Sequence, residues 1–121
     1  MILLDLESRE NMNINIIKDY HIHIYFDETS VELAKKIGIE ASELFSLELG
    51  RFHEKNVGPH PRWSVQLLVP NDKFADALAW MTLNREGLTI FTHPNTGDGL
   101  ADHRDRAIWM GECLELDLSI F

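Results

Sequence analysis

The chain has 121 residues, 45% of them hydrophobic, which fits one globular domain with a modest core. Its formal net charge of −9 disfavours DNA or RNA as a partner, because phosphate binding needs a positive surface. No apolar run approaches the roughly 20 residues of a membrane span, and the N-terminus lacks the features of a signal peptide. We therefore expect a cytoplasmic protein with no nucleic-acid or membrane partner.

The N-terminus differs in pattern from the rest of the chain, because residues 7–11 are polar and show no period. Chain ends of this kind are often loosely ordered. We expect a poorly ordered extension over residues 1–12 and a single domain over residues 13–121. The single cysteine, Cys113, has no partner for a disulfide within the chain, and we expect it to be small and half-buried.

The first elements of the domain are a predicted strand and a predicted helix. Residues 17–26 alternate with a period of two, which predicts a strand with two different faces. One face is apolar and carries Tyr20, Ile22, Ile24 and Phe26, and the other carries His21, His23 and Tyr25. A helix is predicted over residues 29–47, with Thr29 and Glu32 as a capping box and an apolar stripe at helical spacing.

The elements that follow are punctuated by proline and glycine. We predict a short strand over 48–54, a loop over 56–61, a strand over 63–69, a helix over 72–86 and a strand over 88–93. Gly87 would follow the second helix at its C′ position. Residues 102–108 predict one helical turn, and residues 114–121 alternate like an edge strand or an extended segment.

The order strand, helix, strand, strand, helix, strand is that of the α+β, ferredoxin-like βαββαβ fold. Its antiparallel sheet carries both helices on one face, and its first strand lies between the third and the fourth. The opposite face would carry Tyr25, Leu68 and Phe91 among polar groups. Because half-apolar faces often find a partner, we expect a homodimer.

Three histidines fall on that opposite face of the predicted sheet. If Ile22 and Ile90 face the helices, then His21, His23 and His93 face away from them. Neighbouring strands lie about 4.8 Å apart, and imidazole nitrogens bind metals at about 2.0–2.2 Å. We therefore predict His21, His23 and His93 as ligands of one metal ion. The alternative is a polar sheet face without a ligand.

Two further histidines lie in stiff contexts. His60 stands between Pro59 and Pro61, where the backbone is restricted. It is either a rigid surface turn or a general base or substrate contact delivered by a preorganised loop. His103 is either a contact in the site or a cap of the C-terminal segment. Trp63 and Trp109 neighbour these residues and could wall a pocket for an aromatic ligand.

Four motifs in one order resemble the DOPA 4,5-dioxygenase family. They are residues 20–26 (YHIHIYF), 58–61 (GPHP), 93–98 (HPNTGD), and 102–103 (DH) with 107–111 (AIWMG). The resemblance runs from about residue 20 to residue 118, and each motif alone is short. It implies a ferredoxin-like dimer that cleaves a DOPA-like catechol in the extradiol position, with non-haem Fe(II) and O₂.

The resemblance also suggests roles for the histidines. His60 would be the base or a catechol contact, and His103 would lie behind the ligands or contact a substrate carboxylate, which Arg104 or Arg51 could pair. Fe(II) is the expected metal, with Zn or Ni possible in the isolated protein. The common 2-His-1-carboxylate site would need an acidic residue that the predicted face lacks. Either three histidines suffice or a carboxylate joins them; the candidates are Asp98, Asp102 and Glu115.

Two functions of other classes remain open from the sequence. One is a non-enzymatic dimeric protein that binds a metal or a small aromatic molecule. The other is a dimeric scaffold whose polar sheet face forms the subunit interface.

Overall fold

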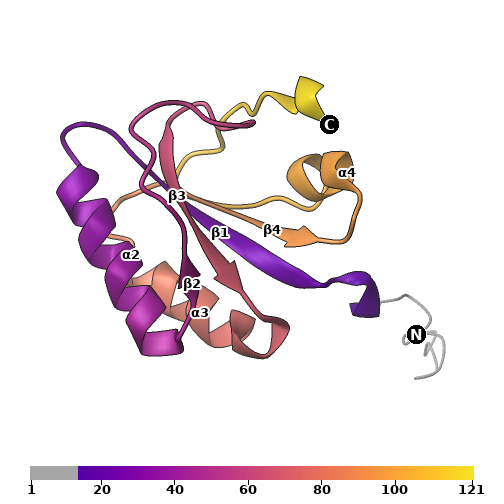
Figure 1. Cartoon of the computed structure of the whole chain (residues 1–121), viewed down its shortest axis with the longest axis horizontal. Helices are drawn as coiled ribbons and strands as arrows, with labels where there is room; N and C mark the ends of the chain where they lie inside the picture. The colour runs from indigo at the N-terminus through magenta and orange to yellow at the C-terminus, as the bar shows by residue number, and fades with distance from the viewer. Residues whose placement is uncertain (1–13) are drawn as a thin grey trace, which may run out of the picture.

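The computed structural model describes residues 14–121 and has an α+β fold with an open five-stranded antiparallel sheet (Figure 1). Its elements are η1 (Ile14–Ile16), β1 (Asp19–Phe26), α2 (Val31–Phe45), β2 (Glu48–Leu49), β3 (Trp63–Val69), α3 (Asn71–Asn84), β4 (Ile90–Asn95), α4 (Gly99–Arg104), β5 (Ile108–Met110) and η2 (Leu118–Ile120). The expected N-terminal extension over residues 1–12 lies outside the described residues. None of the helices described is long and apolar enough to cross a membrane.

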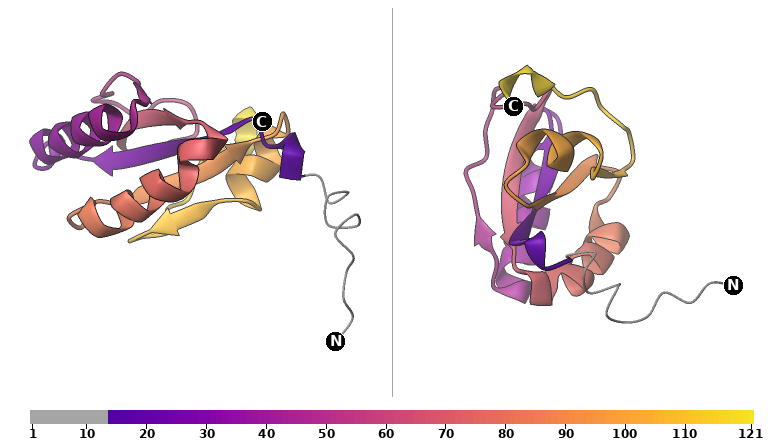
Figure 2. Two further views of the ribbon diagram at one scale, coloured as in Figure 1. Left: turned by 90° about the horizontal axis from the view of Figure 1, so that it is seen from below. Right: turned by 90° about the vertical axis from the view of Figure 1, so that its right-hand side faces the viewer.

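The strands lie in the order β2-β3-β1-β4-β5. β1 is therefore central, between β3 and β4, as the sequence pattern predicted. β5 adds a fifth strand that was not expected, and it pairs with β4 through Ile108–Met110. Helices α2 and α3 lie together, apart from α4 and the C-terminal segment (Figures 1 and 2).

The main core fills the space between α2, α3 and one face of the sheet. Alternate residues of β1 contribute Ile22, Ile24 and Phe26 to this core, and those of β3 contribute Val65, Leu67 and Val69. The apolar stripe of α2 meets them with Ala34, Ile37 and Ala41. Aliphatic burial of this kind supplies most of the favourable free energy of folding. The period-two prediction for β1 and β3 is confirmed.

Two predicted helix ends were wrong in detail. The helix α2 begins after Ser30 without a side-chain cap; instead, the Asp27 carboxylate accepts hydrogen bonds from the backbone N–H groups of Thr29 at 2.8 Å and Ser30 at 3.1 Å. An Asx turn therefore replaces the capping box. At the end of α3, Glu86 takes the first left-handed position, with φ of 47°, and Gly87 follows with φ of 83°.

The chain after β4 differs most from expectation. The turn predicted over residues 102–108 is instead α4, which begins earlier because the Asp98 carboxylate accepts a hydrogen bond from the Ala101 N–H at 3.1 Å. Residues 111–121 form no strand; they make up a C-terminal segment that is irregular except for η2 and lines cavities together with His60 and His103. Cys113 lies in this segment and is exposed, so its predicted half-burial was wrong.

The burial of the sheet face opposite α2 and α3 changes the argument for a dimer. Phe91 is fully buried and Tyr25 is 1% exposed within one chain. Two of the three apolar residues on which the homodimer prediction rested are therefore already buried within one chain, whereas Leu68 is half-buried. The homodimer itself stays a prediction, which light scattering at micromolar concentration would test.

Candidate metal centre

Three histidines converge on the sheet face opposite the helices α2 and α3. His21 on β1 lies directly across the ladder from His93 on β4, and His23 lies two residues further along β1. The nitrogen atoms that these side chains offer all lie within 4.8 Å of one another. His23 is 3% exposed and His93 is 1% exposed. The structure thus brings together the three residues that strand alternation selected.

The hydrogen bonds around His93 fix where its lone pair lies. Its Nδ1 is 2.9 Å from the carbonyl oxygen of Pro94, which can only accept, so Nδ1–H donates. The Nε2 of neutral His93 therefore carries a lone pair, and it lies 3.1 Å from the Nε2 of His23. The Nδ1 of His23 is buried without a partner among the described residues. Two bonds of about 2.0–2.2 Å can span this separation, so one ion could contact both Nε2 atoms.

The three histidines are in the protonation state that metal binding requires. Burial lowers the pKa of His23 well below its usual value, and neighbouring imidazoles reinforce this direction. Burial also lowers the pKa of His93 to about 4. The pKa of His21 is lowered by burial, against the opposing effect of Asp19. Neutral imidazoles are good ligands for Zn, Cu, Fe and Ni, so the donor set fits a divalent transition metal.

None of the three candidate carboxylates joins this group. Both oxygens of Asp102 are used, by the Thr96 N–H and hydroxyl and by Arg106, all at 2.8 Å. Asp98 caps α4, and Glu115 is exposed on the C-terminal segment. Among the described residues, the group of possible ligands therefore consists of histidines alone.

His60 reaches the site from the β2–β3 connection. Its ring centroid lies 4.3 Å from that of His23, and its Nδ1 lies 2.6 Å from the hydroxyl oxygen of Tyr25. Burial lowers the pKa of His60 to about 4, and burial raises the pKa of Tyr25. Sequence alternation placed Tyr25 on the histidine face, but no local signal showed that the 56–61 loop would fold onto it.

His103 reaches the site from α4 on the other side. Its ring centroid lies 4.0 Å from that of His93 and 4.2 Å from that of Phe121, which stacks on it. Its Nδ1–H donates to the carbonyl of Gly99 at 2.7 Å. No local pattern in the sequence indicated Phe121, because its contact with His103 joins residue 121 to a short helix through the fold.

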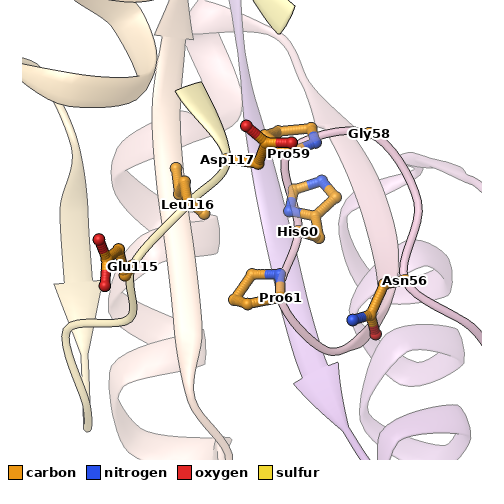
Figure 3. A pocket seen from close by; sticks show the side chains of 8 residues that line it. All are labelled: Asn56, Gly58, Pro59, His60, Pro61, Glu115, Leu116 and Asp117. Atoms are coloured by element: carbon orange, nitrogen blue, oxygen red, sulfur yellow. The ribbon is translucent and has the colours of Figure 1, made fainter. Parts of the chain in front are cut away.

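Two cavities border the site without being lined by the three histidines. The first, of about 520 Å³, lies between His60 and the C-terminal segment (Figure 3), and its lining residues are Asn56, Gly58, Pro59, His60, Pro61, Glu115, Leu116 and Asp117. The second, of about 430 Å³, is lined by His103, Arg104, Trp109 and residues of the same segment. His60 and His103 therefore stand between these cavities and the three-histidine group.

The two arginines and two tryptophans that the sequence suggested as contacts lie in different surroundings. Arg104 lines the second cavity but is held by Asp105 at 2.8 Å, and Arg51 is exposed on the β2–β3 connection. Trp109 lines the second cavity and stacks on Phe91 with ring centroids 4.6 Å apart, as a pocket wall would. Trp63 packs against Phe26 at the core and lines a separate cavity of about 310 Å³, which none of the three histidines lines.

Several known proteins and one protein family resemble this chain in sequence. The family model of the Dopa 4,5-dioxygenase family matches residues 20–120. A protein of Amanita muscaria named DOPA 4,5-dioxygenase is 32% identical over 85% of this chain and 49% of its own length. An uncharacterized 21.2 kDa protein of Botryotinia fuckeliana is 36% identical over 92% of this chain and 67% of its own length. The chain thus spans about half of the Amanita protein.

One solved structure resembles this chain in both fold and sequence. The crystal structure of a candidate dioxygenase from Nostoc punctiforme superposes with a TM-score of 0.85 at 36% identity, covering 88% of this chain and 92% of that one. The family match covers β1 to η2 and includes every histidine described above. The chain therefore belongs to the Dopa 4,5-dioxygenase family.

Proposed function

We propose that this protein is a non-haem iron dioxygenase that opens the ring of a DOPA-like catechol in the extradiol position, using O₂. The family and the names of the relatives support an oxygenase. The observation that carries the proposal is the group of three neutral histidines within 4.8 Å of one another. Such a group leaves coordination positions open for a substrate.

In this proposal His21, His23 and His93 hold the metal. Fe(II) bound there supplies the redox chemistry that joins a catechol and O₂. His60 contacts the catechol, either as its base or as a hydrogen-bond partner, because it lies between His23 and the first cavity. Phe91 and Trp109 form an aromatic wall beside the ligands, and such a wall keeps water from the reaction.

His103 has a supporting role in the proposal. Its ring lies against that of His93 and it borders the second cavity, which Arg104 also lines. It either keeps His93 in place or contacts a carboxylate on the substrate. This chain spans only 49% of the length of the Amanita protein. The activity of that whole protein therefore applies to this chain only as part of the proposal.

The experiment is a reconstitution of the full chain with Fe(II) under anaerobic conditions. DOPA and simpler catechols are then added with O₂. We expect oxygen uptake and a yellow ring-opened product, and no reaction with resorcinol, whose separated hydroxyls cannot chelate one ion. His93→Ala should abolish both metal binding and turnover. His53→Ala is the matched control, because His53 bridges to Ser64 on β3, outside the three-histidine group.

A second candidate is a non-enzymatic dimeric protein that binds a metal or a small aromatic molecule. The observation in its favour is that neither cavity beside the site is lined by the three histidines. It predicts tight binding of Zn²⁺ or Ni²⁺ that depends on His93, with no oxygen uptake by the iron-loaded protein over the whole catechol panel. That result would rule out the dioxygenase proposal.

A further inference from the structure

Tyr25 makes a contact that the proposed chemistry does not yet use. Its hydroxyl oxygen lies 2.6 Å from the Nδ1 of His60, and the residue is 1% exposed. Within the described part of the chain, no second partner lies within hydrogen-bond distance of this hydroxyl. The Tyr25 side chain comes from the centre of the sheet, whereas His60 comes from a surface loop, so the contact joins a rigid strand to the edge of the first cavity.

The direction of this hydrogen bond follows from the two groups. If His60 donated, the Tyr25 hydrogen would be buried with no acceptor, which is costly and rare. The Tyr25 hydroxyl therefore donates, and the Nδ1 of His60 accepts.

The opposite side of the His60 ring is available to a ligand. The loop is held by His60 N–H donating to the Val57 carbonyl at 3.0 Å, and by Asp117 N–H donating to the Pro59 carbonyl at 2.9 Å. Figure 3 shows the His60 ring projecting from this loop beside Asp117 and Leu116. The Nε2 of His60 takes no hydrogen bond from the residues that the structure describes. It is thus the nitrogen left for a molecule in the cavity.

We propose that Tyr25 is a positioning residue that holds neutral His60 in the tautomer with its hydrogen on Nε2, so that His60 presents an N–H donor to the substrate. A neutral imidazole carries one hydrogen, so an occupied Nδ1 lone pair places that hydrogen on Nε2. His60 then has no free lone pair with which to remove a catechol proton. It instead donates a hydrogen bond to an oxygen that gains negative charge. The use of this donor in turnover rests on the proposed function; the tautomer does not.

The tautomer is tested by nuclear magnetic resonance on the full chain with ¹⁵N-labelled histidine. Long-range ¹H–¹⁵N correlations distinguish Nε2–H from Nδ1–H, and the signals of His60 are assigned from their loss in His60→Gln. We expect the Nε2–H pattern in the metal-free and the zinc-loaded protein. Tyr25→Phe should shift His60 toward a mixture of tautomers, whereas Tyr20→Phe should leave it unchanged. Tyr20 is the matched control because it stacks on Phe74, away from His60.

An Nδ1–H pattern in the natural protein would overturn the proposal, even if Tyr25→Phe failed to fold. An unchanged pattern in folded Tyr25→Phe would overturn it as well. Because these measurements need no turnover, they give an answer whether or not the protein is a dioxygenase.

A second test measures the kinetics of variants of the iron-loaded protein. Tyr25→Phe should lower kcat/KM by about tenfold, but by less than about twofold in the His60→Ala background, because Tyr25 acts through His60. His60→Gln keeps an N–H donor without a base, so it should turn over faster than His60→Ala. Equal loss in His60→Gln and His60→Ala, or an undiminished effect of Tyr25→Phe without His60, would contradict the proposed role.

Discussion

The two faces of the strand β1 have opposite characters. Toward α2 and α3 it presents Ile22 and Ile24, which are fully buried among aliphatic side chains. Toward α4 and the C-terminal segment it presents His21, His23 and Tyr25, among which His23 keeps a buried nitrogen without a partner. One strand therefore contributes to the aliphatic core on one face and to the candidate metal centre on the other. A buried polar group without a partner costs folding free energy. The face that carries His21, His23 and Tyr25, here called the histidine face, therefore lowers the stability of the fold, whereas the opposite, aliphatic face raises it.

The coverings of the two faces differ in the same way. Long helices cover the aliphatic face, where non-directional apolar contacts are sufficient. A six-residue helix, a loop and an irregular segment cover the histidine face, held by individual hydrogen bonds such as Asp117 N–H to the Pro59 carbonyl. Loops positioned by a rigid scaffold commonly carry binding residues. Three substitutions should separate these two roles.

The largest effect is expected on the aliphatic face. Ile24→Ala removes a side chain with no exposed surface, and we expect a loss of about 2–5 kcal/mol in the free energy of unfolding. Urea unfolding followed by circular dichroism measures this loss. The metal stoichiometry of the protein that remains folded should not change. A loss below about 1 kcal/mol, or a loss of metal sites in folded protein, would mean that the faces are not independent.

An intermediate effect is expected at the edge of the histidine face, where Asp102 is 3% exposed. Asp102→Asn weakens its bonds to Arg106 and Thr96, which should cost about 1–3 kcal/mol. Burial alone would raise the pKa of Asp102, but hydrogen bonds from Thr96 and Arg106 lower it overall.

This lowered pKa predicts the pH dependence of the Asp102 contribution. Because the folded-state pKa lies below the unfolded value, the stability is fully present above the unfolded value of about 3.9. It is lost as the pH falls through the folded pKa. The difference in unfolding free energy between natural protein and Asp102→Asn should therefore shrink on acidification below about pH 4. A difference that grows with acid would contradict this assignment.

The smallest effect on stability is expected at the three-histidine group itself. His23→Leu removes a buried nitrogen without a partner and keeps an apolar group of similar size. We expect the metal-free variant to be within about 1 kcal/mol of the natural protein, because removing the unpartnered Nδ1 of His23 offsets the loss of its contact with the Nε2 of His93. Calorimetry with Zn²⁺ should show binding by the natural protein and no binding by the variant. A strongly destabilised variant would mean that His23 serves the fold rather than a ligand.

Much of the fold follows from short-range patterns. The alternation in β1 and β3 and the helical stripe of α2 are local, and they predicted the elements and their core faces. The three histidines followed from the same alternation, once β1 was taken as central. Helix ends were less predictable: at α2, Asp27 accepts the hydrogen bond from the Thr29 N–H that Glu32 would accept in a capping box, and an Asx turn forms instead.

The surroundings of the three histidines could not be predicted from local sequence patterns. Asp102 was a candidate ligand because the common 2-His-1-carboxylate site needs an acidic residue, but in the fold its oxygens accept hydrogen bonds from Thr96 and Arg106. The C-terminal segment alternates like a strand, yet β5 occupies the edge next to β4. Local pattern predicts that a segment is able to pair, but competition between segments decides which one does.

The sequence by itself determined which side chains share a face of β1, because a period of two is a property of the extended backbone. It therefore determined that His21 and His23 lie on one side and the aliphatic residues on the other. Only the tertiary structure decided that His60 and His103 lie beside these residues, that Tyr25 contacts His60, and that Asp98, Asp102 and Glu115 lie outside the three-histidine group. Those contacts join residues far apart in sequence, and they depend on how loops close over the sheet rather than on any local preference.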